Sequence, residues 1–161
     1  MILDLIALNE NSRVWLYQAN RELNDQELEL AREQLYDFLD QWTAHSSKLY
    51  CYGNIFHRRF LGIFVDETAT GASGCSIDSS VRFIEQMGRQ LNVDFFDRMN
   101  VYYLDEQENV HGVALNQLAQ EYQEAKVNHE TIFFNNLVKT KKEFLTSWTV
   151  PLKDTWISRY I

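Results

Sequence analysis

Apolar side chains recur every three or four residues after Asn24, and this spacing places them along one face of an α-helix. Asn24 can cap the first turn, with Glu27 three residues later as its partner in a capping box. We therefore expect a helix over residues 24–42 that must bury its apolar face against a second layer of structure. The apolar positions of this face are Leu28, Ala31, Leu35, Phe38, Leu39 and Trp42.

Strand-like runs lie on both sides of this helix. Residues 13–18 are apolar and aromatic, and residues 49–57 and 60–65 are close enough in sequence to pair as an antiparallel hairpin. A second amphipathic helix is expected next, although Gly88 lowers its helix propensity, and a strand at residues 100–104 follows it. The order βαββαβ predicts a ferredoxin-like α+β fold, in which two helices cover one face of a four-stranded antiparallel sheet. The apolar positions of the second helix are Ile77, Val81, Ile84 and Leu91.

The last third of the chain adds a C-terminal helix-strand-helix extension to this unit. A helix is expected at residues 115–122, a strand at residues 131–138, and a short helix that Thr140 and Glu143 begin as a capping box. The 161 residues include one proline, six glycines and no low-complexity tract, so we draw no linker. We expect one α+β domain over residues 1–161.

The chain is acidic, and its charge argues against some partners. Its 15 Lys and Arg residues against 23 Asp and Glu residues leave a formal charge of −8, which repels a phosphate backbone. Residues 1–9 are apolar, but they lack a basic flank and are too short to span a membrane. The four histidines match no zinc-site spacing, and the two cysteines do not indicate a disulfide scaffold. We expect a cytoplasmic protein with reduced thiols, no nucleic-acid partner, no membrane insertion, and no metal or cofactor.

The loop before the second helix carries the side chains best suited to catalysis. Cys75 lies at the start of this helix, whose dipole stabilises a thiolate, so Cys75 is the candidate nucleophile or redox thiol. Its alternative role is that of a small buried residue where strand, loop and helix meet. Gly71 and Gly74 turn the chain here, but the lysine that a phosphate-binding loop requires does not follow Gly74. The loop therefore predicts reactive groups without a complete catalytic motif.

Acid–base and anion-binding groups surround Cys75 in the sequence. Asp66 or Asp78 could act as its base, although Asp78 is explained equally well as a favourable charge in a first helical turn. The backbone amides of Ser76 and Ile77 could form an anion or oxyanion site. These groups define one functional hypothesis, a small enzyme that uses the loop from Asp66 to Asp78. Positive charge for an acidic ligand could come from Arg13, Arg82 or Arg98.

Aromatic side chains are concentrated in the predicted strands, and they lead to a second hypothesis. A ferredoxin-like sheet leaves one face without helices, and an aromatic face needs a cover, either the C-terminal extension or a second molecule. Base stacking is not expected, because the basic, glycine-aromatic signature of RNA-recognition domains is absent. This hypothesis is a non-catalytic binding or assembly module, most simply a homo-oligomer, with a protein partner or a small-molecule ligand as other options. The aromatic residues are Trp15, Tyr17, Tyr50, Tyr52, Phe60, Phe64, Tyr102, Tyr103, Phe133 and Phe134.

Several short strings of residues resemble a known family. They comprise residues 14–18 with Arg21, and residues 41–45, 71–78, 96–100, 134–138 and 148–159. Over almost its whole length the chain is similar to a bacterial family of short proteins commonly labelled "ABC transporter ATPase". The label implies nucleotide hydrolysis, which uses a phosphate-loop lysine and a Leu-Ser-Gly-Gly-Gln type signature that this chain lacks. The resemblance implies a cytoplasmic protein and carries over no catalytic residue, and we do not expect ATP hydrolysis.

Overall fold

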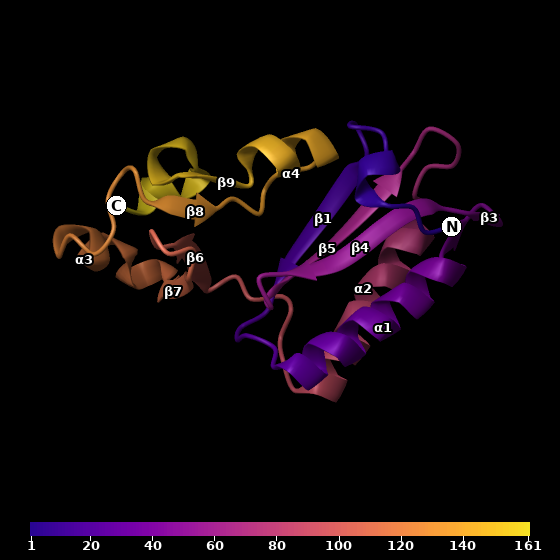
Figure 1. Cartoon of the computed structure of the whole chain (residues 1–161), viewed down its shortest axis with the longest axis horizontal. Coiled ribbons are helices and arrows are strands. Elements are labelled where there is room, and N and C mark those ends of the chain that lie inside the picture. Colours follow the sequence, from indigo (N-terminus) through magenta and orange to yellow (C-terminus); the bar gives the residue numbers. More distant parts are fainter. The chain divides into compact units, whose positions relative to one another are not determined.

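The computed structural model describes residues 1–161, and the chain divides into two compact units. Unit one comprises Met1–Asp97 and Lys139–Lys142, and unit two comprises Arg98–Val138 and Glu143–Ile161. Both units contain helices and an antiparallel sheet, which confirms the α+β class (Figure 1). None of the helices combines the length and the apolar character that crossing a membrane requires.

A three-stranded antiparallel sheet forms the centre of unit one. Its strands are, in spatial order, β1 (Arg13–Gln18), β5 (Phe60–Asp66) and β4 (Tyr50–Phe56). Two long helices, α1 (Asp25–Gln41) and α2 (Gly74–Leu91), lie together on one face of this sheet (Figure 1). Burial of apolar area between these two layers is the main source of stability for the unit. The core between the layers contains Leu35, Leu39, Ile84 and Met87 of the helices and Leu61, Ile63 and Val65 of β5.

Capping boxes begin both long helices. Asn24 Oδ1 accepts a hydrogen bond from the Glu27 N–H at 2.8 Å, and Glu27 Oε1 accepts one from the Asn24 N–H at 2.9 Å. Ser73 and Ser76 form the corresponding reciprocal pair at the start of α2. The helix expected over residues 24–42 is therefore confirmed as α1.

Three shorter pieces complete unit one. A hairpin of β2 (Thr43–Ala44) and β3 (Ser47–Lys48) connects α1 to β4, and a 3-10 helix, η1 (Leu5–Ala7), precedes β1. Lys139–Lys142 runs beside the start of β1, where its first carbonyl accepts from the Val14 N–H at 3.0 Å. A segment far along the sequence therefore closes this edge of the sheet.

The ferredoxin-like topology is not confirmed, because β6 (Asn100–Leu104) does not join the sheet of unit one. It pairs with β7 (Val110–Ala114) and β8 (Ile132–Phe134) in a second antiparallel sheet, of order β7-β6-β8-β9. Asp105 Oδ1 accepts from two backbone amides inside the turn that joins β6 to β7, at 2.8 and 2.9 Å. This turn gives β6 a partner through a short loop, whose closure costs little entropy.

The outer edge of β1 is the second reason for this difference, since a ferredoxin-like fourth strand would have to pair there. Val14 at the start of β1 already donates to the carbonyl of Lys139, as described above. At the other end, the Gln18 carbonyl accepts from the Asp97 N–H at 3.2 Å, and Gln18 forms a parallel bridge with Phe96. Both ends of this edge are therefore occupied, and no regular strand can extend along it.

Unit two is built from shorter elements around a small core. Its helices α3 (Leu118–Gln123) and α4 (Lys141–Ser147) contain six and seven residues, and the first two residues of α4 belong to unit one. The expected helix, strand and helix of the extension correspond to α3, β8 and α4, whereas β7 and β9 (Thr149–Pro151) were not expected. The 3-10 helices of this unit are η2 (Leu115–Gln117), η3 (Leu152–Asp154) and η4 (Trp156–Tyr160). Its core contains Val101, Val113, Leu118, Val127, Phe133, Leu152 and Ile157.

Candidate functional site

Asp66, the candidate base at the end of β5, is buried and accepts three hydrogen bonds. Its Oδ2 accepts from the Asn9 N–H at 2.9 Å, and its Oδ1 accepts from the Thr68 N–H at 3.0 Å and the Thr68 hydroxyl at 2.6 Å. Burial by itself raises the pKa of Asp66, but these hydrogen bonds and the charge of Lys141 outweigh it, so the pKa lies below its usual value. The carboxylate therefore holds the loop and the N-terminal segment together.

The loop after Asp66 is closed by the next carboxylate. Glu67 Oε2 accepts from the Ala72 N–H at 2.9 Å, and Glu67 Oε1 lies 3.6 Å from Arg13 Nε. The Arg13 guanidinium also lies over the Trp15 ring, 4.5 Å from its centroid. Arg13, a candidate source of charge for an acidic ligand, thus interacts with two groups of the protein itself.

The two backbone amides expected to bind an anion already have a partner in Ser73, the residue that caps α2. The Ser76 N–H donates to Ser73 Oγ at 3.1 Å, and the Ile77 N–H donates to the Ser73 carbonyl at 2.9 Å. Trp42 Nε1 donates to the Ser76 carbonyl at 2.9 Å and so anchors the start of the helix on the core. A ligand would have to displace the capping interactions in order to use these two donors.

Cys75, Asp78 and Arg82 are all exposed and share one face of α2. Their spacing of three and four residues is the helical repeat that places side chains above one another. Cys75 is a free cysteine at the surface, so it does not fill the core as its alternative role required. The structure therefore brings together three of the candidate residues, whereas the buried carboxylate of Asp66 is engaged by Thr68 of its own loop and by the Asn9 backbone. Arg98 is an exposed residue of unit two.

The second cysteine has the opposite environment. Cys51, on β4, is buried, and burial raises the pKa of its thiol to about 11. Its Sγ lies 3.5 Å from the Leu39 carbonyl, to which the thiol can donate. Cys75 is therefore the thiol that a reagent can reach.

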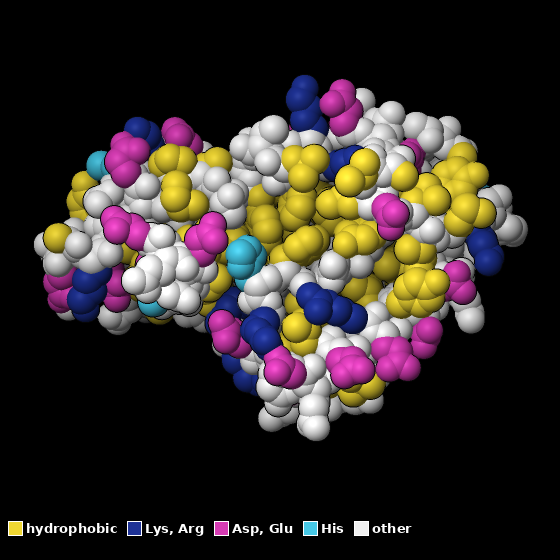
Figure 2. All heavy atoms as spheres, viewed as in Figure 1, with side chains coloured by type: hydrophobic (Ala, Val, Ile, Leu, Met, Phe, Trp, Pro, Cys, Tyr) yellow, Lys and Arg dark blue, Asp and Glu magenta, His cyan; other side chains and the backbone are white.

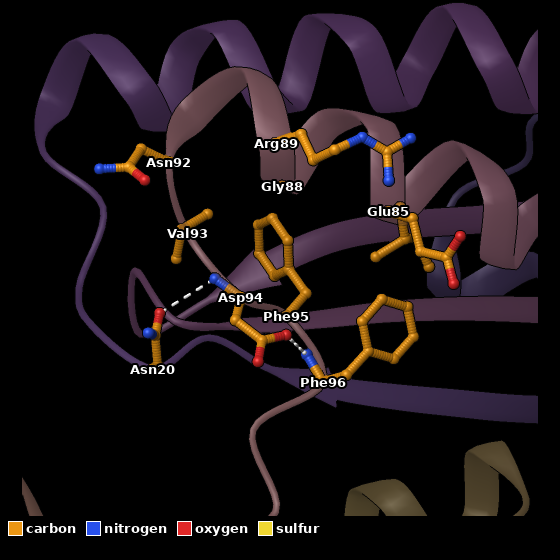
Figure 3. Close-up of a pocket in the computed structure, with 10 residues that line it drawn as sticks. Asn20, Glu85, Gly88, Arg89, Asn92, Val93, Asp94, Phe95 and Phe96 are labelled. Carbon is orange, nitrogen blue, oxygen red and sulfur yellow. Dashed lines mark hydrogen bonds between the residues drawn. The ribbon is translucent and has the colours of Figure 1, made fainter.

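A pocket of about 500 Å³ lies at the far end of α2 from Cys75. Figure 3 shows Glu85 and Arg89 on α2 at one side, and Asp94, Phe95 and Phe96 at the other, on the segment that follows the helix. None of these residues was predicted to form a site, because their approach depends on how the chain turns after α2. The pocket combines apolar walls with three charged side chains, as ligand sites in proteins commonly do.

Gly88 is the one sequence signal that could have indicated this pocket. A Cβ at this position would lie 2.6 Å from the Val93 carbonyl oxygen, so only glycine lets the segment after α2 approach the helix so closely. Asn92 ends the helix in the left-handed region at φ 54°, and the Val93 N–H donates to the Gly88 carbonyl at 2.9 Å. A glycine inside an amphipathic helix thus indicates close backbone contact.

The structure groups no metal ligands, and comparison with known proteins found no relative. No three His, Cys, Asp or Glu side chains are grouped so that they could hold a metal ion. The chain matches no protein-family model, no curated protein and no solved structure with which it was compared. The family resemblance of the sequence therefore stays a prediction.

Proposed function

We propose that this chain is a non-catalytic binding or assembly module that self-associates through the helix-free face of the sheet in unit one. The observation that supports a module is the state of the candidate catalytic groups. The Asp66 carboxylate and the amides of Ser76 and Ile77 are already engaged in holding the loop and the start of α2. A reaction centred on Cys75 would need these groups to be free for the substrate.

The helix-free face offers apolar contact area. Phe60 and Phe64 of β5 face this side but are themselves fully buried, so contact with a second molecule falls to the half-buried side chains beside them, such as Tyr52, whose ring lies 6.0 Å from the Phe64 ring. Half-buried apolar side chains stand around them, and hydrophobic side chains gather over β1, β4 and β5 in Figure 2. Aromatic side chains of this kind contribute strongly to protein interfaces. The half-buried residues of this face are Leu16, Tyr50, Tyr52 and Phe56.

The edges of the sheet are poor sites for adding a strand from a second molecule, which supports association through the face of the sheet instead. On β4, the Cys51 N–H and carbonyl pair with Met1 and Leu3. Farther along, the Ile55 carbonyl accepts from Arg32 Nη2 at 3.0 Å. The edge of β1 is occupied at both ends, as described above. Edges blocked in this way disfavour pairing between molecules, which leaves the helix-free face as the contact surface.

The oligomeric state tests this proposal directly. We expect sedimentation of the full chain to show a concentration-dependent dimer, and Tyr52→Lys to raise its dissociation constant about tenfold or more. Leu16→Lys, on the other edge strand, is a second variant in case the first does not fold. Tyr36→Lys makes the same change at an exposed position of α1 and should leave association unchanged. A wild-type chain that stays monomeric at every concentration would refute self-association.

The small enzyme built on Cys75 is the second candidate, favoured by the exposed thiol that shares a helix face with Asp78 and Arg82. Its test is the alkylation rate of Cys75 in the folded protein at pH 6, measured by mass spectrometry with buried Cys51 as the internal control. A rate above that of a cysteine-containing reference peptide would favour the enzyme; a rate at or below it would favour the module. ATP hydrolysis is not proposed, whereas a cytoplasmic location, where free thiols persist, is part of the proposal.

A further inference from the structure

We propose that the pocket at the C-terminal end of α2 binds a small organic cation, a protonated amine carried on an apolar body. This inference goes beyond the proposed self-association, because the pocket lies on the side of the sheet that carries the helices. Its lining residues Ile84 and Phe95 belong to the core between helices and sheet. Ligand binding here and association through the helix-free face can therefore succeed or fail independently.

Both walls of the pocket are held in place by the protein. Two hydrogen bonds join the segment after α2 to the turn that follows β1. The Asp94 N–H donates to Asn20 Oδ1 at 3.0 Å, and the Asn20 N–H donates to the Asp94 carbonyl at 2.9 Å. On the other wall, Arg21 Nη2 donates to the Leu91 carbonyl at 2.7 Å and so fixes the end of α2. A pocket formed in advance binds without paying much entropy to order its walls.

The charges around the pocket favour a positive ligand. Glu85 and Asp94 are exposed carboxylates, and neither takes part in an ion pair. Asp94 uses Oδ1 to accept from the Phe96 N–H at 2.8 Å, which leaves Oδ2 for a ligand. The C-terminal end of a helix also carries partial negative charge, so α2 adds to the field of the two carboxylates.

The apolar walls suit the body of such a ligand. Phe96 is half-buried, and its ring meets the Tyr17 ring edge-on with centroids 5.4 Å apart, which fixes its orientation. An aromatic face attracts an ammonium group as well as apolar surface, so Phe96 can serve both parts of the ligand. Val93 adds to the apolar wall, and the fully buried Ile84 supports it from the core. The volume of about 500 Å³ accommodates a single ring with a short amine chain.

Arg89 allows the sign of the ligand's charge to be tested, because it lines the same pocket as Glu85 and Asp94 with the opposite charge. It forms no ion pair with Glu85 one turn away, and Figure 3 shows both side chains extending from α2 beside the pocket. A cationic ligand would be repelled by Arg89, so removing this charge should strengthen binding. A ligand that carries a carboxylate would show the reverse, since its binding should weaken when Arg89 is removed.

The experiment titrates the full chain at pH 7 with two probes that share a phenethyl group and differ in charge, 2-phenylethylamine and 3-phenylpropionate. Amide chemical shifts of Gly88 and of residues 92–96 report binding at the pocket. We expect 2-phenylethylamine to bind with a dissociation constant of about 1 mM, the range of a ligand of this size, and 3-phenylpropionate not to bind. Binding of the anion alone, or of neither probe, would overturn the proposal.

Variants that remove single charges then test whether the cation binds in this pocket. Glu85→Gln and Asp94→Asn should each weaken 2-phenylethylamine binding about threefold, and Arg89→Gln should strengthen it about twofold, as single exposed charges do. Glu33→Gln on α1 and Lys48→Gln on β3 change the net charge equally at exposed positions outside the pocket, and should leave binding unchanged. Equal effects from the matched controls, or weaker binding in Arg89→Gln, would contradict the proposed site.

Discussion

The two units of this chain reach a folded core by different means. Unit one has helices of 17 and 18 residues, each with a capping box and a continuous buried face. Unit two has helices of six and seven residues, which are too short to be stable alone, and depends on turns, 3-10 segments and a sheet of short strands. Local sequence signals therefore specify the helices of unit one, whereas unit two also depends on pairing between more distant segments, such as β6 with β8.

Substitutions in the two cores should have the strongest effects on stability, and they test whether the two units form the single domain expected from the sequence. Leu35→Ala in the core of unit one and Leu118→Ala in the core of unit two should each lower the free energy of unfolding by about 2–5 kcal/mol. In a single domain, urea unfolding shows one transition that both variants shift. Two transitions, each moved by one variant only, would show that the units unfold separately. Leu145→Ala, at an exposed position, is the control.

The next effect concerns close packing in unit one. Gly88→Ala places a Cβ 2.6 Å from the Val93 carbonyl oxygen, and the strain should lower the free energy of unfolding by about 1–3 kcal/mol. Gly74→Ala, in the first turn of the same helix, meets no atom within 4 Å and should be neutral or slightly stabilising. Thermal unfolding measures both variants. Equal melting temperatures would show that the segment after α2 is not held as closely as described.

A smaller loss of stability should follow when the ion pair that links the two long helices is removed. Arg21 donates to both carboxylate oxygens of Glu27, at 3.0 and 2.7 Å, and also to the last turn of α2. The hydrogen bond from Arg21, then that of the Asn24 backbone, lowers the pKa of Glu27 from 4.5 to about 2. Glu27→Gln should lower the free energy of unfolding by about 1 kcal/mol at pH 7.

The pH dependence of this effect follows from the direction of the shift. Because the pKa of Glu27 is lower in the folded protein, its contribution is complete above pH 4.5 and disappears as the pH falls toward 2. The difference between wild type and Glu27→Gln, measured by urea unfolding, should therefore shrink over that interval. A difference that is constant from pH 7 to pH 3 would argue against the ion pair.

The smallest expected effect is a local one in unit two. Asp105 Oδ2 lies 2.8 Å from His111 Nε2, and this hydrogen bond, followed by that of the Asn109 N–H, lowers the pKa of Asp105 to about 2. Asp105→Asn should loosen the turn between β6 and β7 without unfolding the chain. Hydrogen exchange measures this loosening, and the Asn109 amide should exchange faster in the variant. Glu106→Gln, exposed in the same turn, should leave the exchange unchanged. In the wild type the same loosening should begin as the pH falls below 3.8.

The candidate site could be predicted only in part. The position of Cys75 in the first turn of α2 follows from the local pattern of Ser73 to Ile77, and so does its place on one helix face with Asp78 and Arg82. The engagement of Asp66 could not be predicted, because its partners include Asn9, 57 residues away, and the charge of Lys141. A sequence indicates that a carboxylate is present but not which distant donors satisfy it.

The elements whose interactions lie within a few residues could be derived from the sequence. These are the caps and apolar faces of α1 and α2, and the hairpin of β4 and β5, which depend on side-chain spacing and on short loops. The folded chain was needed to show which sheet β6 joins, how the outer edge of β1 is closed, and where the pocket forms beside Gly88. Those features depend on competition among distant partners for the same hydrogen-bonding groups and the same space, which local spacing does not encode.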